Sequence, residues 1–179
     1  MEADMQLRDV MLGFLSWEPM TGYELKKLFS DSDFLPWSGN NNQIYKTLVS
    51  LDKQGLVKKE VIHQESLPSK KRYSITEEGM AQLREALAGT PDSPEVKKLF
   101  LMQLAWGDYL DEEALLSLLN QYQEEIEGRL AMVKEKYKRK TIHQSRTRRE
   151  AFLWDMIWEN QIMTYQNELN WLAKLRNGL

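Results

Sequence analysis

Four consecutive amide side chains, Asn40, Asn41, Asn42 and Gln43, precede an apolar stripe of helical period. An amide carries a donor beside an acceptor, and this pattern matches the exposed edge of an adenine base. A helix N-terminus also directs unpaired backbone N–H groups outward, where they attract phosphate. These residues could therefore recognise a nucleic acid. The alternative is that they cap the helix and form the turn before it, a role that asparagine often takes.

The helix that would position these amides is expected to span about residues 40–54. Ile44, Leu48 and Leu51 recur at i, i+4 and i+7, so they form one stripe that a core can bury. Gly55 suits the left-handed position just beyond the last turn. One side of this helix is thus fixed to the protein, and the other side is available to a partner.

Two earlier helices are expected to support this one. Apolar residues at helical spacing predict a first helix over about residues 5–17. Thr21 and Glu24 have the spacing of a capping box, so a second helix should start at Gly22. Three short helices with tight connections are typical of a helix-turn-helix unit.

A basic hairpin is expected next. Residues 57–64 and 71–75 alternate well enough to form two strands, and the loop between them contains Pro68. Three consecutive cations follow that loop: Lys70, Lys71 and Arg72. A basic hairpin directly after a helix-turn-helix predicts a winged helix, and Thr76 is placed to cap a further helix.

Residues 7–89 resemble the PadR family of bacterial winged-helix transcriptional regulators. Three segments carry the resemblance, in the family's order and spacing: MLGFLSWEPMTGYELKKLF (11–29), QIYKTLVSLDKQGLV (43–57) and KKRYSITEEG (70–79). The resemblance implies that the Gly-Tyr-Glu-Leu run from Gly22 starts the second helix. It also implies that Ile44 and Tyr45 lie in the recognition helix and that a basic wing precedes Tyr73.

The sequence departs from many members of that family at the wing tip. Ser66, Leu67, Pro68 and Ser69 stand before the lysines, where many members carry Gly-Arg-Pro-Arg-Lys. Positive charge is therefore shifted toward the strand, which leaves open how deeply the wing reaches into a minor groove.

The predicted function is sequence-specific DNA binding by a transcriptional regulator, acting as a repressor. A symmetric dimer would set two recognition helices into successive major grooves of an inverted-repeat operator. The residues expected near base edges are Asn40, Asn41 and Gln43. Those expected at the DNA backbone are Tyr23, Lys26, Asn42, Tyr45, Lys46, Lys70, Lys71 and Arg72. The alternative is a winged helix that serves as a protein-interaction module without sequence-specific DNA binding.

The second half of the chain predicts a helical domain. The joint TPDSP (90–94) suggests a boundary between a DNA-binding domain, residues 1–89, and a helical domain, residues 90–179. Within the latter, a short apolar helix should end at Gly107, a long helix should begin after Asp111, and a last helix should span about residues 148–176. The predicted fold is mostly α: a winged helix-turn-helix of three helices and a two-stranded β-hairpin wing, followed by a helical dimerisation domain.

The main apolar stripe of the last helix is the predicted dimerisation surface. It consists of Trp154, Trp158, Ile162, Tyr165, Leu169 and Leu172, and a flank beside it contains Phe152, Leu153, Met156, Ile157 and Met163. Two long helices cannot cover this much apolar surface between them, so a homodimer is expected. The resemblance implies the same, since PadR-like regulators dimerise through C-terminal helices and a long two-helix version marks one subgroup. The alternative is that the tryptophans build a core within one chain.

The resemblance also implies a small effector, because PadR-like members often sense aromatic or amphipathic molecules. The candidates for lining an effector pocket are Trp106, Trp154 and Trp158. The alternative is that these tryptophans belong to the core, which is the usual role of an aromatic stripe.

Composition limits the other functions of the chain. A net charge of −3 over 179 residues argues against indiscriminate binding to polyanions. The chain has no cysteine and two histidines, His63 and His143, so we expect no enzyme, no metal and no cofactor. No apolar stretch approaches the ~20 residues of a membrane span, and a cytoplasmic protein is expected. The basic run 134–149, with eight Lys and Arg residues, is interpreted as a solvated helix tip.

Overall fold

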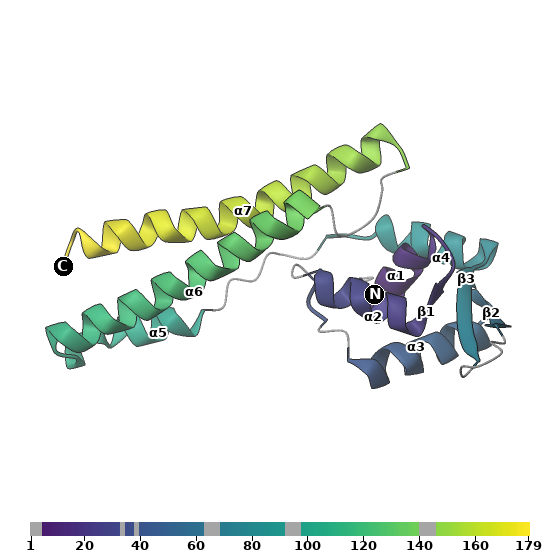
Figure 1. The fold of residues 1–179 in the computed structure, drawn as a ribbon, viewed down its shortest axis with the longest axis horizontal. Helices are drawn as coiled ribbons and strands as arrows, with labels where there is room; N and C mark the ends of the chain where they lie inside the picture. Colours follow the sequence, from purple (N-terminus) through teal and green to yellow (C-terminus); the bar gives the residue numbers. More distant parts are fainter. Residues whose placement is uncertain (1–4, 33–34, 38–39, 63–68, 92–97, 140–145) are drawn as a thin grey trace. The chain divides into compact units, whose positions relative to one another are not determined.

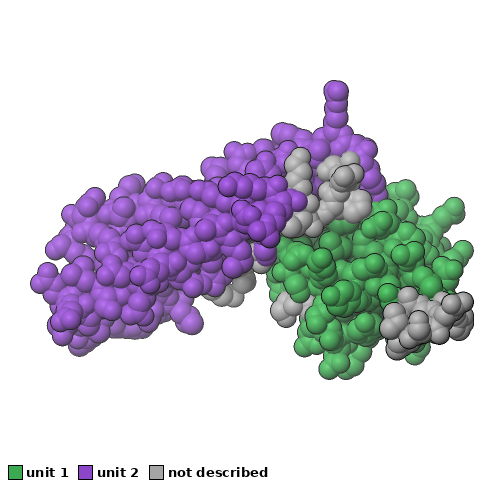
Figure 2. Space-filling view, in the orientation of Figure 1, with its two compact units in different colours: residues 1–94 green, residues 95–179 purple. Residues whose placement is uncertain are grey.

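The computed structural model describes residues 5–32, 35–37, 40–62, 69–91, 98–139 and 146–179. The chain divides into two compact units, residues 1–94 and residues 95–179 (Figure 2). Helices dominate both units, and a small antiparallel sheet lies in the first (Figure 1). The predicted fold class is confirmed. Among the described residues, none of the helices combines the length and the apolar character that crossing a membrane requires.

The first unit contains four helices and three short strands among its described residues. In chain order they are α1 (Leu7–Leu15), β1 (Met20–Thr21), α2 (Gly22–Asp31), α3 (Asn41–Lys53), β2 (Val57–Ile62), β3 (Lys70–Ile75) and α4 (Glu77–Leu87). The sheet has the order β1-β3-β2, with β3 antiparallel to both neighbours. The strand β1 was not predicted, because two residues are too few to show an alternating pattern.

The core of this unit fixes the inner side of α3. Ile44, Leu48 and Leu51 are at most 1% exposed, as the i, i+4, i+7 spacing predicts. They belong to one cluster with the buried faces of α1 and α2, which includes Met11 and Leu25. The orientation of α3 about its own axis is therefore set by apolar burial, and the identity of its outward face follows from that burial.

The connection from α3 to the sheet depends on two glycines. Gly55 has φ +72°, the left-handed conformation expected just after the helix. The hydroxyl of Thr76 donates a hydrogen bond to the Gly55 carbonyl (2.8 Å) and accepts one from the Gly79 N–H (3.1 Å). A Cβ on Gly79 would lie 2.1 Å from the Leu56 carbonyl oxygen, so only glycine lets α4 approach this turn.

The second unit is built on two long antiparallel helices, α6 (Glu112–Arg139) and α7 (Arg148–Arg176). Before them come a short helix α5 (Leu99–Ala105) and the 3-10 turn η1 (Gly107–Tyr109). Asp111 caps α6 as expected, accepting a hydrogen bond from the Ala114 N–H (2.8 Å). The bounds of α7 agree with the sequence-based expectation.

The helix α5 covers one end of the α6–α7 pair (Figure 1). Phe100 of α5 stacks on Tyr122 of α6, with ring centroids 3.6 Å apart, and both contribute to a cluster with Leu119 and Leu172. Glu168 accepts a hydrogen bond from the Tyr122 hydroxyl (2.7 Å) and forms an ion pair with Lys98, at the start of α5. These contacts fasten α5 to both long helices.

The predicted dimerisation stripe lies largely on the side of α7 that packs within the unit. Trp158 and Leu172 are 6% and 1% exposed, and the Trp158 ring lies 6.2 Å from that of Tyr137 on α6. These two side chains are covered by their own chain, and the role of the stripe in dimerisation stays a prediction. Trp154, Ile162, Tyr165 and Leu169 are half-buried.

Candidate nucleic-acid interface

The outward face of α3 carries a polar stripe with one apolar residue. Asn42, Lys46, Val49 and Lys53 are all exposed, and they recur at steps of four, three and four, opposite the buried stripe. This spacing places four side chains in one row along the helix. A row of amide, cation and methyl groups on a fixed helix suits the mixed edges of bases in a major groove.

The amides at the start of α3 have different tasks. The side-chain oxygen of Asn40 accepts a hydrogen bond from the Asn42 N–H (3.0 Å), so Asn40 is the N-cap and its acceptor is engaged. Asn41 and Gln43 are exposed on either side of the outward row. Asn42, expected at the DNA backbone, instead stands at the head of that row. The capping alternative therefore applies to Asn40 alone.

Tyr45 of α3 lies against the first turn of α2. A Cβ built on Gly22 would be 2.5 Å from Cε1 of the Tyr45 ring, so the ring fits there because residue 22 has no side chain. Tyr45 is nevertheless 48% exposed, and its neighbour Tyr23 is 71% exposed. Both phenol groups stand at the surface near the amide row, where they could donate hydrogen bonds to phosphate.

The start of α2 is held by the predicted capping box. The Thr21 N–H donates to Glu24 Oε2 (2.7 Å), and the Glu24 N–H donates to Thr21 Oγ1 (3.3 Å). Burial is the largest influence on the pKa of Glu24 and raises it, but the hydrogen bonds from Thr21 and the charges of Arg72 and Lys70 outweigh it. The pKa of Glu24 is therefore lowered, and its carboxylate faces the cations of β3.

The wing strands bring further cations beside α3. Lys70, Lys71 and Arg72 of β3 are exposed, and Thr21 of β1 pairs with Arg72. On β2, Lys59 forms an ion pair with Asp52 of α3 at 2.7 Å. The hydrogen bond to Asp52 is the main reason that the pKa of Lys59 is raised. Pro68, expected at the wing tip, lies outside the described residues, as does His63.

Val49 was missed by the sequence analysis. It is 50% exposed on the outward row, although it is apolar. The signal was present, because Val49 lies off the stripe formed by Ile44, Leu48 and Leu51 and so has no place in the core. An apolar residue on a polar outward face suits contact with the methyl group of thymine. Lys26, expected at the DNA backbone, is half-buried.

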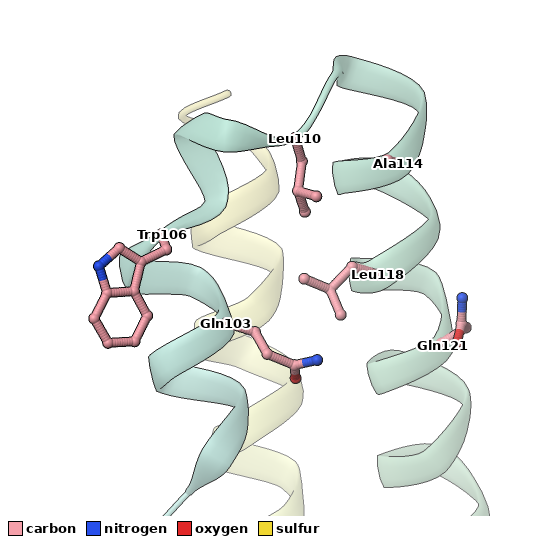
Figure 3. A pocket seen from close by; sticks show the side chains of 6 residues that line it. All are labelled: Gln103, Trp106, Leu110, Ala114, Leu118 and Gln121. Carbon is pink, nitrogen blue, oxygen red and sulfur yellow. The ribbon is translucent and has the colours of Figure 1, made fainter.

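A concave feature lies in the second unit, between α5 and α6 (Figure 3). It has a volume of about 370 Å³ and is lined by Gln103, Trp106, Leu110, Ala114, Leu118 and Gln121. Gln103, Leu110 and Leu118 extend into the space between the helices, whereas the Trp106 ring lies on the outer side of α5. We call this feature the α5–α6 recess.

The three tryptophans expected to line one pocket are not brought together. Trp106 directly precedes Gly107, where a Cβ would lie 3.4 Å from Leu115 in the first turn of α6. Trp158 contacts Tyr137, near the other end of α6. The 22 residues from Leu115 to Tyr137 rise about 33 Å along a helix. A single pocket in one chain therefore cannot contain both Trp106 and the Trp154–Trp158 pair.

The described part of the basic run is partly neutralised. Arg139 pairs with Glu135 (2.9 Å) and Arg146 with Glu150 (2.8 Å), each within one helix turn. Residues 140–145, including His143, lie outside the description. In the part of the chain that is described, no three His, Asp or Glu side chains are grouped as a metal site would require.

Two family matches account for most of the chain. Residues 11–85 match the PadR-like family of transcriptional regulators. Residues 96–179 match the C-terminal region of the virulence activator alpha family. The boundary between the two matches falls close to the boundary between the two compact units.

Two proteins of known sequence illustrate the similarity. A probable transcriptional regulator of Mycobacterium tuberculosis is 33% identical over 90 residues, which are 50% of this chain and 47% of that protein. The chain thus spans about half the length of that relative. The negative transcriptional regulator PadR of Bacillus subtilis is 24% identical over 134 residues, 74% of each chain.

Solved structures share the fold over nearly the whole chain. A PadR-like transcriptional regulator from Bacillus cereus has a TM-score of 0.75 at 28% identity, covering 96% of this chain and 94% of that one. Bacillus subtilis PadR in complex with operator DNA has a TM-score of 0.82 at 22% identity, covering 94% and 96%. The same protein in complex with p-coumaric acid has a TM-score of 0.74 at 20% identity, covering 94% and 95%.

The amide-tipped helix beside a basic hairpin, the matched families and the shared fold lead to one assignment. The winged-helix unit belongs to the PadR-like family of DNA-binding transcriptional regulators, and a C-terminal helical extension follows it.

Proposed function

We propose that the protein is a repressor that binds an inverted-repeat operator as a homodimer. The observation that supports this most directly is the outward row of α3, where Asn42, Lys46 and Val49 stand exposed beside the cations of β3. In this proposal α3 enters the major groove, and half-sites lie about one helical turn, ~34 Å, or a multiple apart. Repression is proposed because Bacillus subtilis PadR, which shares the fold, is a negative regulator.

Base readout is assigned to the amides at the N-terminal end of α3. Asn41, Asn42 and Gln43 have exposed side chains there, and a good bidentate amide–adenine pair contributes about 1–3 kcal/mol of discrimination. Asn40 serves mainly as the helix cap, with its amide nitrogen still available to DNA. The capping role predicts that Asn40→Asp keeps the helix start intact, since aspartate caps equally well.

Contacts with the DNA backbone are assigned to cationic and phenolic side chains around α3. The proposed set is Tyr23, Lys26, Tyr45, Lys46, Lys70, Lys71 and Arg72. Such contacts hold the protein in register but read no sequence. Each lost lysine contact should weaken binding to all sequences alike and lower the slope of log K against log salt by roughly one.

A selection of bound duplexes from a random pool tests the proposal. The expected result is one enriched inverted repeat, and the Asn42→Ala variant should bind it with about five- to 150-fold lower affinity, the equivalent of 1–3 kcal/mol. Lys134→Ala, on the basic run outside the winged helix, is the matched control and should bind as wild type does. No enrichment at moderate salt would overturn the proposal and favour a protein-interaction module.

A small planar aromatic effector is proposed for the α5–α6 recess. The recess combines leucine side chains with the amides of Gln103 and Gln121, and its volume is in the range of small-ligand sites. Bacillus subtilis PadR has been crystallised with p-coumaric acid, which is a molecule of this class. Calorimetric titration with a phenolic panel should show binding, and Leu118→Trp, whose larger side chain fills the recess, should abolish it. No binding by any member of the panel would overturn the effector proposal.

A further inference from the structure

The residue at which the chain enters the helical part of the second unit is held by one carboxylate. Glu168 of α7 forms an ion pair with Lys98, the N-cap residue of α5. The same carboxylate accepts a hydrogen bond from the Tyr122 hydroxyl of α6 (2.7 Å). The Glu168 side chain is 11% exposed, so its charge is largely covered by these partners. One carboxylate thus joins α5, α6 and α7 at the residue where α5 begins.

Apolar contacts hold the rest of α5 against the two long helices. Phe100 is 6% exposed, and its ring stacks on that of Tyr122 with centroids 3.6 Å apart. The Phe100 ring also lies perpendicular to that of Trp171 on α7, at a centroid distance of 6.3 Å. Leu104, one helical turn further along α5, packs against the same cluster. The ion pair and the ring contacts together keep α5 docked.

The docking of α5 determines how much chain connects the two units. Pro91 is the last residue of the first unit that the structure describes, and Lys98 follows seven positions later. Seven residues can span at most about 25 Å. If α5 were released, the first fixed residue of the second unit would be Asp111, the cap of α6, twenty positions after Pro91. Twenty residues can span about 70 Å, so docking shortens the connection nearly threefold.

The length of that connection affects how a dimer binds two half-sites. Once the first winged-helix unit is bound, binding of the second is an intramolecular step, and its effective concentration depends on the connecting chain. Beyond the length that just spans the sites, this concentration falls roughly as the −3/2 power of length. A connection nearly three times longer would lower it about fivefold. The longer connection would also reach half-sites at other spacings, whereas the short one selects among them.

We propose that Lys98, Phe100, Tyr122 and Glu168 are positioning residues that set the half-site spacing which this protein accepts. They act through α5, whose docking keeps the connection between the two units short. This proposal rests on the proposed function, because it requires a homodimer and an inverted-repeat operator. It does not depend on which surface joins the two copies, since the connection has the same length in any dimer.

Two alanine variants on α6 separate the docking of α5 from general stability. Tyr122→Ala removes the stacking partner of Phe100 and one hydrogen bond to Glu168, so α5 should detach. Tyr137→Ala is the matched control, because its hydroxyl also donates to a carboxylate of α7, Asp155 (3.3 Å), but near the opposite end of α6 from α5 (Figure 1). Both variants should bind a single half-site as wild type does. On the inverted repeat selected from the random pool, only Tyr122→Ala should bind about fivefold more weakly.

Duplexes with altered spacing test the selectivity itself. When a few base pairs are inserted between the half-sites, wild type and Tyr137→Ala should lose affinity toward the value for a single half-site. Tyr122→Ala should lose less, because its longer connection still reaches both half-sites. Mobility shifts with the series of duplexes measure the preference.

A charge exchange provides a second arm that leaves the aromatic cluster intact. Lys98→Glu places two carboxylates together and should relax the spacing preference, and adding Glu168→Lys to the same chain should restore it. An unchanged spacing preference in both Tyr122→Ala and Lys98→Glu would overturn this inference while leaving the proposed function standing. A failure to select any inverted repeat with the wild-type protein would overturn both.

Discussion

Asp52 of α3 accepts a hydrogen bond from Lys59 of β2 at 2.7 Å, so an ion pair ties the recognition helix to the first wing strand. Both side chains remain partly exposed, and exposed pairs of this kind add little to stability. The pair has a larger effect on the charge of the surface that is proposed to bind DNA. It neutralises one lysine beside α3 and places one carboxylate close to where DNA is proposed to lie.

Asp52→Asn should therefore strengthen DNA binding. The substitution removes a negative charge and releases Lys59 toward phosphate, so the slope of log K against log salt should steepen by roughly one. Mobility shifts at several salt concentrations measure the slope. Adding Lys59→Met to the same chain should cancel the gain. An unchanged slope in Asp52→Asn would show that this edge of α3 does not approach DNA.

Gly79→Ala should destabilise the first unit. The new Cβ would lie 2.1 Å from the Leu56 carbonyl oxygen, and backbone atoms cannot move aside as a side-chain tip can. Overpacking of this kind costs about 1–3 kcal/mol, and the cost should appear in denaturant unfolding. Gly128→Ala is the matched control, since nothing lies within 4 Å of a Cβ there. That change, inside α6, should stabilise the protein by up to about 1 kcal/mol. Equal effects at the two glycines would contradict the close approach.

Gly22→Ala should displace the Tyr45 ring, whose Cε1 would lie 2.5 Å from the added carbon. Because a ring can rotate away, we expect a loss of about 1–2 kcal/mol in unfolding free energy and weaker DNA binding. Tyr45→Ala removes the clashing atoms, so the double variant should be no less stable than Tyr45→Ala alone. Simple addition of the two losses would show that Gly22 acts in some other way.

Val49 should discriminate thymine from the other bases at one position of each half-site. Val49→Ser keeps the helix surface but removes the methyl groups, so the preference for thymine there should fall by about 1 kcal/mol, the scale of one buried methyl group. The unfolding free energy should hardly change, because Val49 is 50% exposed. Sequence selection with both proteins checks this. An identical preferred sequence for the two would place Val49 away from the bases.

The Glu168 site predicts a stability profile that falls at both ends of the pH range. Burial, the largest influence, raises the pKa of Glu168, but the hydrogen bonds from Lys98 and Tyr122 outweigh it and lower the pKa. A lowered carboxyl pKa adds stability above the unfolded value, about 4.3, and this stability is lost as the pH falls through the folded value. Burial and the bond to Glu168 raise the pKa of Tyr122, so its contribution is lost as the pH rises above about 10.

The Glu168→Gln variant tests the loss of stability at both acidic and alkaline pH. Unfolding of the variant should depend less on pH at the acidic end, because no carboxylate remains to be protonated. Its alkaline loss should also be reduced, since glutamine places no negative charge beside the Tyr122 hydroxyl. Denaturant melts from about pH 2.5 to about pH 11.5 measure the two slopes, and slopes equal to those of wild type would contradict the role of Glu168.

The predictions that depended on local signals were the most accurate. The Thr21–Glu24 capping box, the left-handed Gly55 and the bounds of α7 depend on neighbouring residues, and the structure contains all three. The strand β1 depends instead on pairing Met20 with Tyr73, which lies 53 positions away. A pattern of two residues is too short to predict that contact.

The roles of individual site residues were harder to predict, because they depend on the rotation of a helix about its axis and on the residue at which the helix starts. Whether Asn40 caps the helix or faces DNA changes with a shift of one residue in the helix start. Periodicity likewise identified both apolar stripes of α7, but it could not tell which one faces α6. Trp106 lies beside the first turn of α6, and Trp158 lies beside its last turns. Composition does not reveal the distance between these two places.

The placement of α5 at one end only of the α6–α7 pair also makes the second unit uneven in local stability. Near Phe100 and Leu172 three helices share a core, whereas near Tyr137 and Trp158 the described contacts are those between α6 and α7. Amide hydrogen exchange should therefore be slowest around Leu119 and faster toward the C-terminal end of α6.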